Sequence, residues 1–185
     1  MLPISVRAST PSGPLIDGLA ELLLDSVAEG NSIGFLHDLS RQQACAWWLS
    51  ALQEPGTATW VAIDPSAAAA DGGLHSGDDV LGCVRLTPAG KDNARHRAEV
   101  GKLLVHRRAR RQGIAAALMG ELEREAASSG QVLLLLDTCT GSPAEQAYRG
   151  WGWTAYGIVE DHAALPDGRL APTTFFTKRL DQMGS

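Results

Sequence analysis

The sequence lacks several features that define whole classes of protein. It has no apolar run near the ~20 residues of a membrane-spanning helix, and no basic segment followed by an apolar core at its start, so we expect neither a membrane partner nor a secretory leader. Its three cysteines and five histidines are scattered without a CxxC pair, which predicts reduced thiols, a cytoplasmic location and no metal site. With a net charge of −5 and only 5% aromatic residues, the composition also argues against a nucleic-acid partner.

The remaining profile is that of one globular domain. The 185 residues are 44% hydrophobic and 20% charged, so we expect a single domain over residues 1–185 with a sizeable core. Residues 65–79 (PSAAAADGGLHSGDD) are too polar and too rich in small side chains to pack well, and they predict a mobile hairpin loop within that domain. The sequence leaves the oligomeric state open between a monomer and a homodimer.

Hydrophobic periodicity predicts the element order β-α-α-β-β-β-α-β-α-β-β. Two apolar helical stripes come first, and the second follows Ser40, with Gln43 at the capping-box position. Segments 57–64 and 80–87 have the character of antiparallel strands, whereas the apolar run in 131–138 is typical of a parallel strand buried on both faces. We therefore predict an α/β fold whose mixed, mostly antiparallel sheet contains a central parallel β-α-β unit with a right-handed crossover.

The stretch from 98 to 122 holds the first strand and the helix of this parallel unit. The strand ends with LLV at 103–105, apolar residues at i, i+4 and i+8 follow from Ile114, and the turn between them reads RRQGIA over 110–115. Because the first amides of a helix lack internal partners and Gly113 has no Cβ, this turn predicts an anion site, most naturally for a phosphate group. The chain contains neither the GxxxxGK motif of a P-loop nor the GxGxxG of a Rossmann fold, so the phosphate belongs to another kind of ligand.

Two motifs resemble those of one enzyme family. The R-x-x-G-x-A pattern at 110–115 resembles the Q/R-x-x-G-x-G/A pyrophosphate motif of the GNAT superfamily of acetyl-CoA-dependent N-acetyltransferases, and YRGWGW at 148–153 resembles the Y-x-x-x-G-F/W segment that closes the family's last helix. The resemblance covers nearly the whole chain and implies the GNAT fold, acetyl-CoA as co-substrate, and direct attack of an amine on its thioester. One departure is TGS at 140–142, where many members carry an Asn that contacts coenzyme A; Ser142 is the candidate substitute.

The resemblance also implies which residues bind the cofactor. The amides of the 110–115 turn would hold the pyrophosphate, and the backbone of 103–105 would pair with the pantetheine arm like an added strand. Three interpretations of Arg107, Arg108 and Arg110 stay open, namely screening of the cofactor phosphates, nucleic-acid binding and a solvated turn, and their location favours the first. The complete predicted set is Leu103, Leu104, Val105, Arg110, Arg111, Gln112, Gly113, Ile114, Ala115 and Ser142.

Three residues are candidates for the chemistry, because an amine attacks a thioester only when it is neutral and therefore needs a base. Glu99 lies on the strand before the turn, and Asp137 ends the apolar run; by resemblance, these carboxylates deprotonate or orient the acceptor amine. The alternatives for Glu99 are the polar face of an alternating strand and an ion pair with Arg97, and the alternative for Asp137 is a helix cap. Tyr148 resembles the family tyrosine that donates a proton or a hydrogen bond to the departing thiolate, with core packing as its alternative.

The function that we expect is acetyl transfer to the amine of a small molecule, in a pocket formed by the loop at 33–38 and the segment 157–169. Several stretches, among them RAEVGKLLVHRRARRQG, resemble family members that inactivate a β-lactam toxin, so an amino-acid-like or β-lactam acceptor is expected. Two alternatives stay open. One is a protein or peptide N-acetyltransferase, and the other is a non-catalytic acyl-CoA-binding regulatory module, against which the three catalytic candidates argue.

Overall fold

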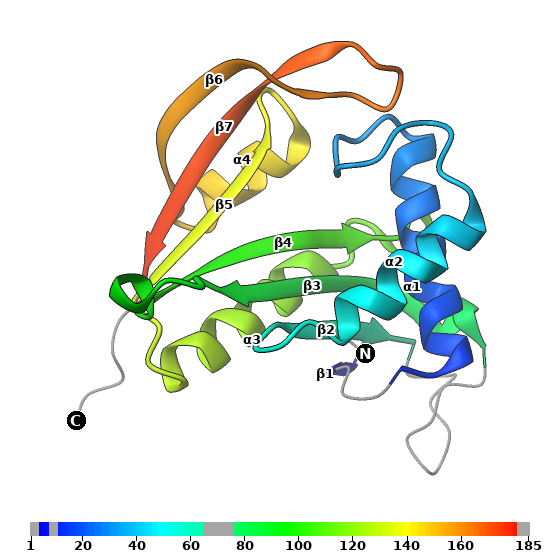
Figure 1. The fold of residues 1–185 in the computed structure, drawn as a ribbon, viewed down its shortest axis with the longest axis horizontal. Coiled ribbons are helices and arrows are strands. Elements are labelled where there is room, and N and C mark those ends of the chain that lie inside the picture. The colour runs from blue at the N-terminus through cyan, green and yellow to red at the C-terminus, as the bar shows by residue number, and fades with distance from the viewer. Residues whose placement is uncertain (1–3, 8–10, 65–75, 181–185) are drawn as a thin grey trace.

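The computed structural model describes residues 4–7, 11–64 and 76–180, and within them one seven-stranded sheet carries four α-helices (Figure 1). The strand order is β1-β2-β3-β4-β5-β7-β6, with β4 and β5 the one parallel pair among the described strands. The predicted element order and fold class are confirmed. No helix in the described part of the chain is long and apolar enough to cross a membrane.

The elements are β1 (Ile4–Arg7), α1 (Gly13–Ala28), α2 (Arg41–Leu52), β2 (Ala58–Ile63), β3 (Val80–Pro88), β4 (Arg97–Val105), α3 (Ile114–Ser128), β5 (Leu133–Cys139), α4 (Pro143–Gly150), β6 (Thr154–Ala164) and β7 (Leu170–Arg179), with short 3-10 turns at Gly77–Asp79, Asp92–Ala94 and Arg107–Ala109.

The predicted hairpin loop at 65–79 falls mostly outside the described residues, which exclude 65–75. Its last residues form the 3-10 turn Gly77–Asp79. The Asp78 amide donates to Ser76 Oγ at 3.2 Å, and the Ser76 amide donates to the Asp79 carboxylate at 2.9 Å. These reciprocal bonds fix the chain where it enters β3.

The two N-terminal helices begin at residues whose side chains cap them. Ser12 Oγ accepts from the Leu15 amide at 3.4 Å at the start of α1. At α2 the predicted capping box is confirmed: the Gln43 amide donates to Ser40 Oγ at 3.2 Å, and the Ser40 amide donates to Gln43 Oε1 at 2.8 Å. A cap of this kind stabilises a helix by about 1 kcal/mol, so the loop between α1 and α2 is held between two well-defined helices.

The helices cover the two faces of the sheet unequally (Figure 1). On one face α3 packs its predicted apolar stripe, Ile114, Leu118 and Leu122, against the strands, and α4 contributes to the same core. On the other face α1 and α2 form a second core that reaches Leu104 of β4 and includes no residue of β5, β6 or β7. One face of the β5–β7–β6 part therefore has no helix over it in the described structure.

The prediction that the apolar run of β5 is buried on both faces is wrong. Leu134 and Leu136 are buried in the core with α3 and α4. Leu133 and Leu135 point to the opposite face and are only half-buried, and Asp137 on that face is exposed. The reason is that α1 and α2 lie over the β2–β4 half of the sheet and do not extend to β5.

The central strands β4 and β5 run side by side over a short distance and then separate. Their parallel register begins at Arg97 and Leu133 and ends at Glu99 and Leu135. Beyond these residues β4 remains paired with β3, and β5 with β7. The sheet therefore opens between two strands that both continue (Figure 1), and the candidate site lies around this opening.

Candidate functional site

The two carboxylates predicted for catalysis lie where the sheet opens. Glu99 is paired in register with Leu135, so these side chains share a face, and Asp137 follows two residues later on the same face of β5. The two carboxylates therefore project from the same face, one from each of the two strands, at the point where these strands separate. Both carboxylates are exposed, and neither has a hydrogen bond or ion pair with another described residue.

The structure excludes the ion-pair alternative for Glu99 and the helix-cap alternative for Asp137, whereas the exposed Glu99 between buried Ala98 and Val100 also fits the polar face of an alternating strand. Glu99 and Arg97 form no ion pair in the described part of the chain. Helix α4, which follows Asp137, is capped by Ser142, whose Oγ accepts from the Glu145 amide at 3.2 Å. Glu99 and Asp137 are therefore available to a ligand. The Ser142 hydroxyl already caps α4, and its role as a substitute for the family's Asn stays a prediction.

Tyr148 of α4 has its ring in the core. The side chain is 7% exposed, and the ring centroid lies 5.9, 6.1 and 6.0 Å from those of Trp151, Trp153 and Phe176. Burial, and to a smaller extent the negative charge of Asp137, raise the pKa of the phenol above its ordinary value. Tyr148 is therefore a neutral phenol at physiological pH, able to donate from its hydroxyl.

The turn before α3 has the backbone that its sequence predicts. Arg111 and Gly113 both adopt left-handed conformations, with φ of 58° and 80°. The Ala117 amide donates to the Gly113 carbonyl at 3.0 Å, and this bond opens the helix, so the amides before Ala117 have no intrahelical partner. No side chain caps this helix and its first turn holds no acidic residue. Free amides and the positive end of the helix dipole therefore favour an anion here.

The strand segment predicted to pair with the pantetheine arm borders the same opening. Leu104 is buried against α1 and α2, whereas Leu103 and Val105 are half-buried. Here β3 occupies one edge of β4, with Gly82 opposite Val105, and β5 no longer occupies the other. The free edge of β4 suits an extended ligand that adds as a strand.

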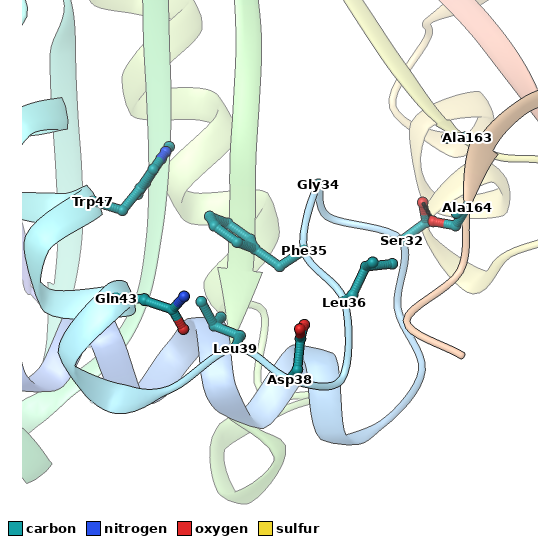
Figure 2. Close-up of a pocket in the computed structure, with 10 residues that line it drawn as sticks. All are labelled: Ser32, Gly34, Phe35, Leu36, Asp38, Leu39, Gln43, Trp47, Ala163 and Ala164. Atoms are coloured by element: carbon teal, nitrogen blue, oxygen red, sulfur yellow. Dashed lines mark hydrogen bonds between the residues drawn. The ribbon is translucent and has the colours of Figure 1, made fainter. Parts of the chain in front are cut away.

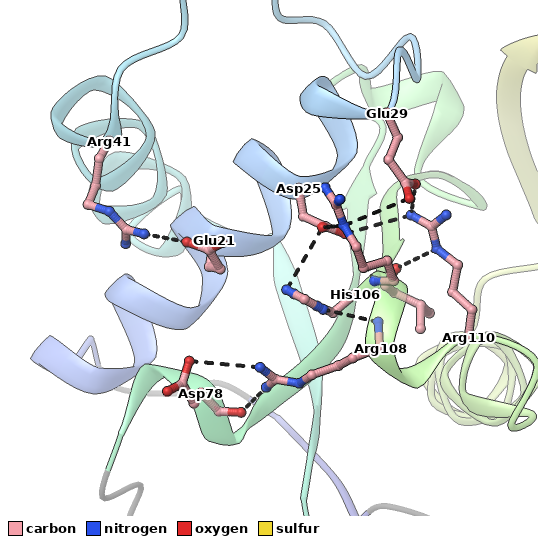
Figure 3. A network of polar contacts seen from close by, with 10 residues as sticks. Glu21, Asp25, Glu29, Arg41, Asp78, His106, Arg108 and Arg110 are labelled. Atoms are coloured by element: carbon pink, nitrogen blue, oxygen red, sulfur yellow. Dashed lines mark hydrogen bonds and ion pairs between the residues drawn. The ribbon is translucent and has the colours of Figure 1, made fainter.

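The predicted arginine cluster is held by acidic residues of the fold (Figure 3). The Arg107 amide donates to the Asp25 carboxylate at 3.0 Å, and its guanidinium pairs with the same group. Arg110 pairs with Glu29, lies 3.7 Å from Asp25, and donates from Nε to the Val105 carbonyl at 3.1 Å. These guanidinium groups therefore anchor the turn to α1. A cluster that served only to screen phosphate groups would not require these ion pairs.

The remaining residues of the turn are distributed between core and surface. Ile114 is buried in the α3 core, Ala115 is half-buried, and Gln112 Nε2 donates to a backbone carbonyl at 3.4 Å. The exposed Arg111 side chain has no hydrogen bond or ion pair with any described residue. Among the arginines of the turn, Arg111 is therefore the one free to reach a phosphate.

The two segments predicted to form the acceptor pocket do lie together (Figure 2). Ser32 Oγ donates to the Ala164 carbonyl at 3.2 Å, and the His37 amide donates to the Pro166 carbonyl at 3.0 Å, so the loop between α1 and α2 is joined to the β6–β7 hairpin. Between them is a cavity of about 540 Å³ with an apolar and aromatic wall and a few polar groups. It is lined by Ser32, Gly34, Phe35, Leu36, Asp38, Leu39, Gln43, Trp47, Ala163 and Ala164.

Sequence reasoning missed two charged residues of this region. Asp25 is an acidic residue that is only 4% exposed. Its position between apolar residues of the α1 stripe is the sequence feature that could have indicated its burial. Lys102 has a φ of 51°, and no local sequence pattern predicts that conformation for a lysine. No group of three or more His, Cys, Asp or Glu side chains in the described residues is arranged to hold a metal ion.

An open parallel strand pair, an uncapped helix start and two carboxylates without a partner among the described residues form a site that suits a phosphate-bearing ligand and a cationic group. The family model described as "Acetyltransferase (GNAT) family" matches residues 32–153, and the protein belongs to this family. The family resemblance read from the motifs is thereby confirmed.

Solved structures of acetyltransferases share the fold over nearly their whole length. An N-acetyltransferase from Staphylococcus aureus Mu50 is 14% identical, with a TM-score of 0.74 over 96% of this chain and 99% of that one. A ribosomal-protein-alanine N-acetyltransferase from Brucella melitensis is 21% identical, with a TM-score of 0.71 over 95% and 99%. A GNAT superfamily phosphinothricin acetyltransferase from Sinorhizobium meliloti, solved in complex with acetyl-CoA, is 20% identical, with a TM-score of 0.72 over 95% and 88%. At these identities the likeness establishes the fold.

Proposed function

We propose that this protein is an acetyl-CoA-dependent N-acetyltransferase that moves an acetyl group directly to the amine of a small molecule. The observation that carries the proposal is the opening between β4 and β5 after Glu99 and Leu135, which sets two unpaired carboxylates beside a free strand edge and an uncapped helix start. Acetyl-CoA fits this arrangement, since its pyrophosphate would lie on the amides at 111–115 and its pantetheine arm along 103–105. The complex of the Sinorhizobium relative with acetyl-CoA supports this choice of co-substrate.

The residues of the opening divide the chemistry between them. When bound, acetyl-CoA supplies the thioester-activated acetyl group. Glu99 and Asp137 attract the acceptor ammonium and take its proton, because the amine must be neutral to attack. Tyr148 holds a proton on its phenol oxygen for the departing sulfur. Since burial raises the pKa of Tyr148 above its ordinary value, the phenol is a weaker acid than the coenzyme A thiol, and a donated hydrogen bond is favoured over complete proton transfer.

Replacing Tyr148 with Phe is expected to lower kcat about 10²-fold and to change coenzyme A affinity less than twofold, since the ring still packs and the sulfur loses its donor. Because the raised pKa keeps the phenol protonated well above neutral pH, the ratio of wild-type to variant kcat should stay constant between pH 6 and 9. The matched control is Tyr156→Phe at the other tyrosine of the chain, which is 60% exposed on β6. An equal loss of kcat and of coenzyme A affinity in Tyr148→Phe would contradict the donor role.

The acceptor that we propose is an amino-acid-like or β-lactam amine, with toxin or antibiotic inactivation as the biological role. The stretches GLAELLLDSVAEGNSIGFLHDLSRQQACAW, RAEVGKLLVHRRARRQG and PDGRLAPT resemble the tabtoxin resistance acetyltransferase, which acetylates the amino group of a β-lactam toxin. The cavity of about 540 Å³ is of a size for a small ligand. Its aromatic wall, with Asp38 and Gln43 as polar groups, suits a compact body that carries an amine.

A peptide or protein acceptor is the second candidate. Strand β6, whose end borders the cavity, exposes Tyr156, Ile158 and Val159 by 60, 54 and 46%. Exposed apolar side chains in a row on an edge strand can contact an extended peptide. The Brucella relative, named as a ribosomal-protein-alanine N-acetyltransferase, supports keeping this candidate.

The experiment that tests the proposal measures thiol release from acetyl-CoA against amino acids, β-lactam amines, polyamines and short peptides. We expect a small amine to be acetylated by the wild type and Gly113→Val to weaken coenzyme A binding at least tenfold, because a β-branched residue is strongly disfavoured at a φ of 80°. Gly120→Val is the matched control on the same helix, where an added Cβ meets nothing within 4 Å.

Three other results would change the assignment. Acetylation of peptides alone would favour the second candidate. Coenzyme A binding, followed as a thermal shift, without transfer to any amine would favour the non-catalytic binding module. The absence of both binding and transfer would overturn the proposal.

A further inference from the structure

Lys102 lies in a β-bulge of β4, three residues after Glu99. The pairing of β3 with β4 is regular as far as Arg85 and Gly101, and resumes at Cys83 and Leu104, so β4 holds one extra residue at this point. Lys102 takes a left-handed conformation there, with a φ of 51°. Without the bulge, alternation along the strand would direct this lysine into the α3 core. The bulge turns it instead to the face covered by α1 and α2.

The Lys102 side chain reaches the loop that lines the cavity and the helix that follows it. Its Nζ donates to the Ile33 carbonyl at 2.9 Å. The same nitrogen lies 5.6 Å from the ring centroid of Phe35 and 5.1 Å from that of Trp47, which are cation–π distances. Phe35 and Trp47 also pack edge to face at 5.5 Å and belong to the wall of the cavity. One lysine of the central strand thus holds the backbone and two wall residues of the acceptor side.

The surroundings of Lys102 are unusual for a lysine. Burial, and then the nearby charge of Arg85, lower its pKa, while the charge of Asp137 acts in the opposite direction. No carboxylate forms an ion pair with Lys102 among the described residues. Partial burial of an ammonium group whose partners are a carbonyl and two ring faces costs desolvation free energy. A contact at the protein surface would hold the loop with a smaller desolvation cost.

We propose that Lys102 is a positioning residue, which fixes the Ile33–Phe35 loop and Trp47 against the bulge of β4 and so sets the acceptor cavity at a defined distance from Glu99. This inference rests on the proposed function for its catalytic meaning, while its structural content does not depend on which acceptor is used. The strand that carries Glu99 and the free cofactor edge is the same strand that holds the acceptor loop. Movement of the loop relative to the bulge would therefore misplace the acceptor amine and leave the cofactor contacts intact.

The first test is hydrogen exchange of the ligand-free protein, which needs no acceptor. In Lys102→Met, amides of residues 31–39 should exchange about tenfold faster than in the wild type, with β5 and α3 unchanged, because the loop loses its hydrogen bond and its cation–π partner. Lys91→Met, at an exposed lysine of the turn before β4, is the matched control and should leave the loop unchanged. Lys102→Arg should keep most of the protection, because it retains the positive charge.

The second test separates acceptor from cofactor. With any amine that the wild type acetylates, Lys102→Met should raise the acceptor KM about tenfold and change the coenzyme A Kd less than twofold. Unchanged loop exchange in a folded Lys102→Met, or equal acceleration throughout α3 and β5, would overturn the proposal. If Lys102→Met does not fold, Phe35→Leu is the second variant, because it removes one of the two rings that Lys102 contacts. Unchanged amide exchange of residues 31–39 in Phe35→Leu would also overturn the proposal. A wild type that acetylates no amine would defeat the proposed function and leave the exchange result to decide the role of Lys102.

Discussion

Glu99→Gln and Asp137→Asn are each expected to lower kcat/KM for an accepted amine by about 10²–10⁴-fold, the usual range for the loss of a general base. Each substitution keeps the size of the side chain but removes its charge and replaces one acceptor oxygen with a donor NH2 group. Coenzyme A affinity should change less than twofold, because neither carboxylate lies in the helix start or on the strand edge assigned to the cofactor. Steady-state kinetics with acetyl-CoA and one accepted amine measures both quantities.

The pH dependence of these variants identifies the step that is lost. A lysine-like ammonium has an ordinary pKa of about 10, so raising the pH supplies the neutral amine without a protein base. The deficit of both variants should therefore shrink between pH 7 and 10. Because the two carboxylates act on one ammonium, the loss of kcat/KM in the double variant should be smaller than the product of the losses in the two single variants.

A matched control keeps the carboxylate interpretation falsifiable. Asp92 lies in the exposed turn before β4 and forms a surface ion pair with Arg95 at 2.5 Å. Asp92→Asn should leave kcat/KM within twofold, since exposed pairs contribute little. If Glu99→Gln and Asp137→Asn behave like Asp92→Asn at neutral pH, the amine loses its proton by another path.

Much of the fold could be predicted because local patterns and tertiary packing agree. The capping box at Ser40, the apolar stripe of α3 and the turn at Gly113 each rest on interactions within a few residues of one another, and the structure contains all three. The prediction that β5 is buried on both faces was wrong for a reason that lies in the tertiary structure. An apolar run reports that a strand is suitable for burial, but helices from elsewhere in the chain decide whether both faces are covered.

The candidate site was predictable to the extent that it follows strand ends and helix starts. The positions of Glu99 and Asp137 beside the opening follow from the order of the elements. The partners of Arg107, Arg110 and Lys102 do not, because these contacts join residues that lie 69 (Lys102 to Ile33), 82 (Arg107 to Asp25) and 85 (110 − 25) positions apart. The contact of Lys102 depends in addition on a bulge that changes the direction of its side chain. Long-range polar contacts of this kind have no period in the sequence.

The Asp25 network joins the first helix to the segment before α3. Asp25 is buried on α1 and faces the start of the Arg107–Ala109 turn, where it accepts from the amide and the guanidinium of Arg107 and lies 3.7 Å from the guanidinium of Arg110 (Figure 3). His106 Nε2 lies 3.9 Å from the same carboxylate. The segment so held leads within a few residues to Gly113 and the free amides of α3. A carboxylate of the first helix thereby attaches to α1 the segment that leads into the turn that we propose for the cofactor phosphates.

Asp25→Asn is therefore expected to lower both stability and cofactor affinity. An amide cannot replace a buried carboxylate that accepts from a guanidinium and a backbone amide and pairs with a second guanidinium, and the loss should be about 3 kcal/mol. For a chain of this length that corresponds to a Tm lower by about 6–12 °C. We expect coenzyme A to bind about tenfold more weakly, because the 106–110 segment loses its attachment to α1. Thermal unfolding and titration with coenzyme A measure the two effects.

Two control variants separate this network from a general effect of charge on α1. Asp17→Asn makes the same substitution at an exposed position of the helix and should change the free energy of unfolding by less than about 0.5 kcal/mol. Glu29→Gln removes a more exposed partner of Arg110 and should cost less stability than Asp25→Asn. If Asp25→Asn lowers Tm but binds coenzyme A like the wild type, Asp25 stabilises the fold without positioning the turn. If its Tm also matches that of Asp17→Asn, the arginines hold the turn through Glu29 and the backbone.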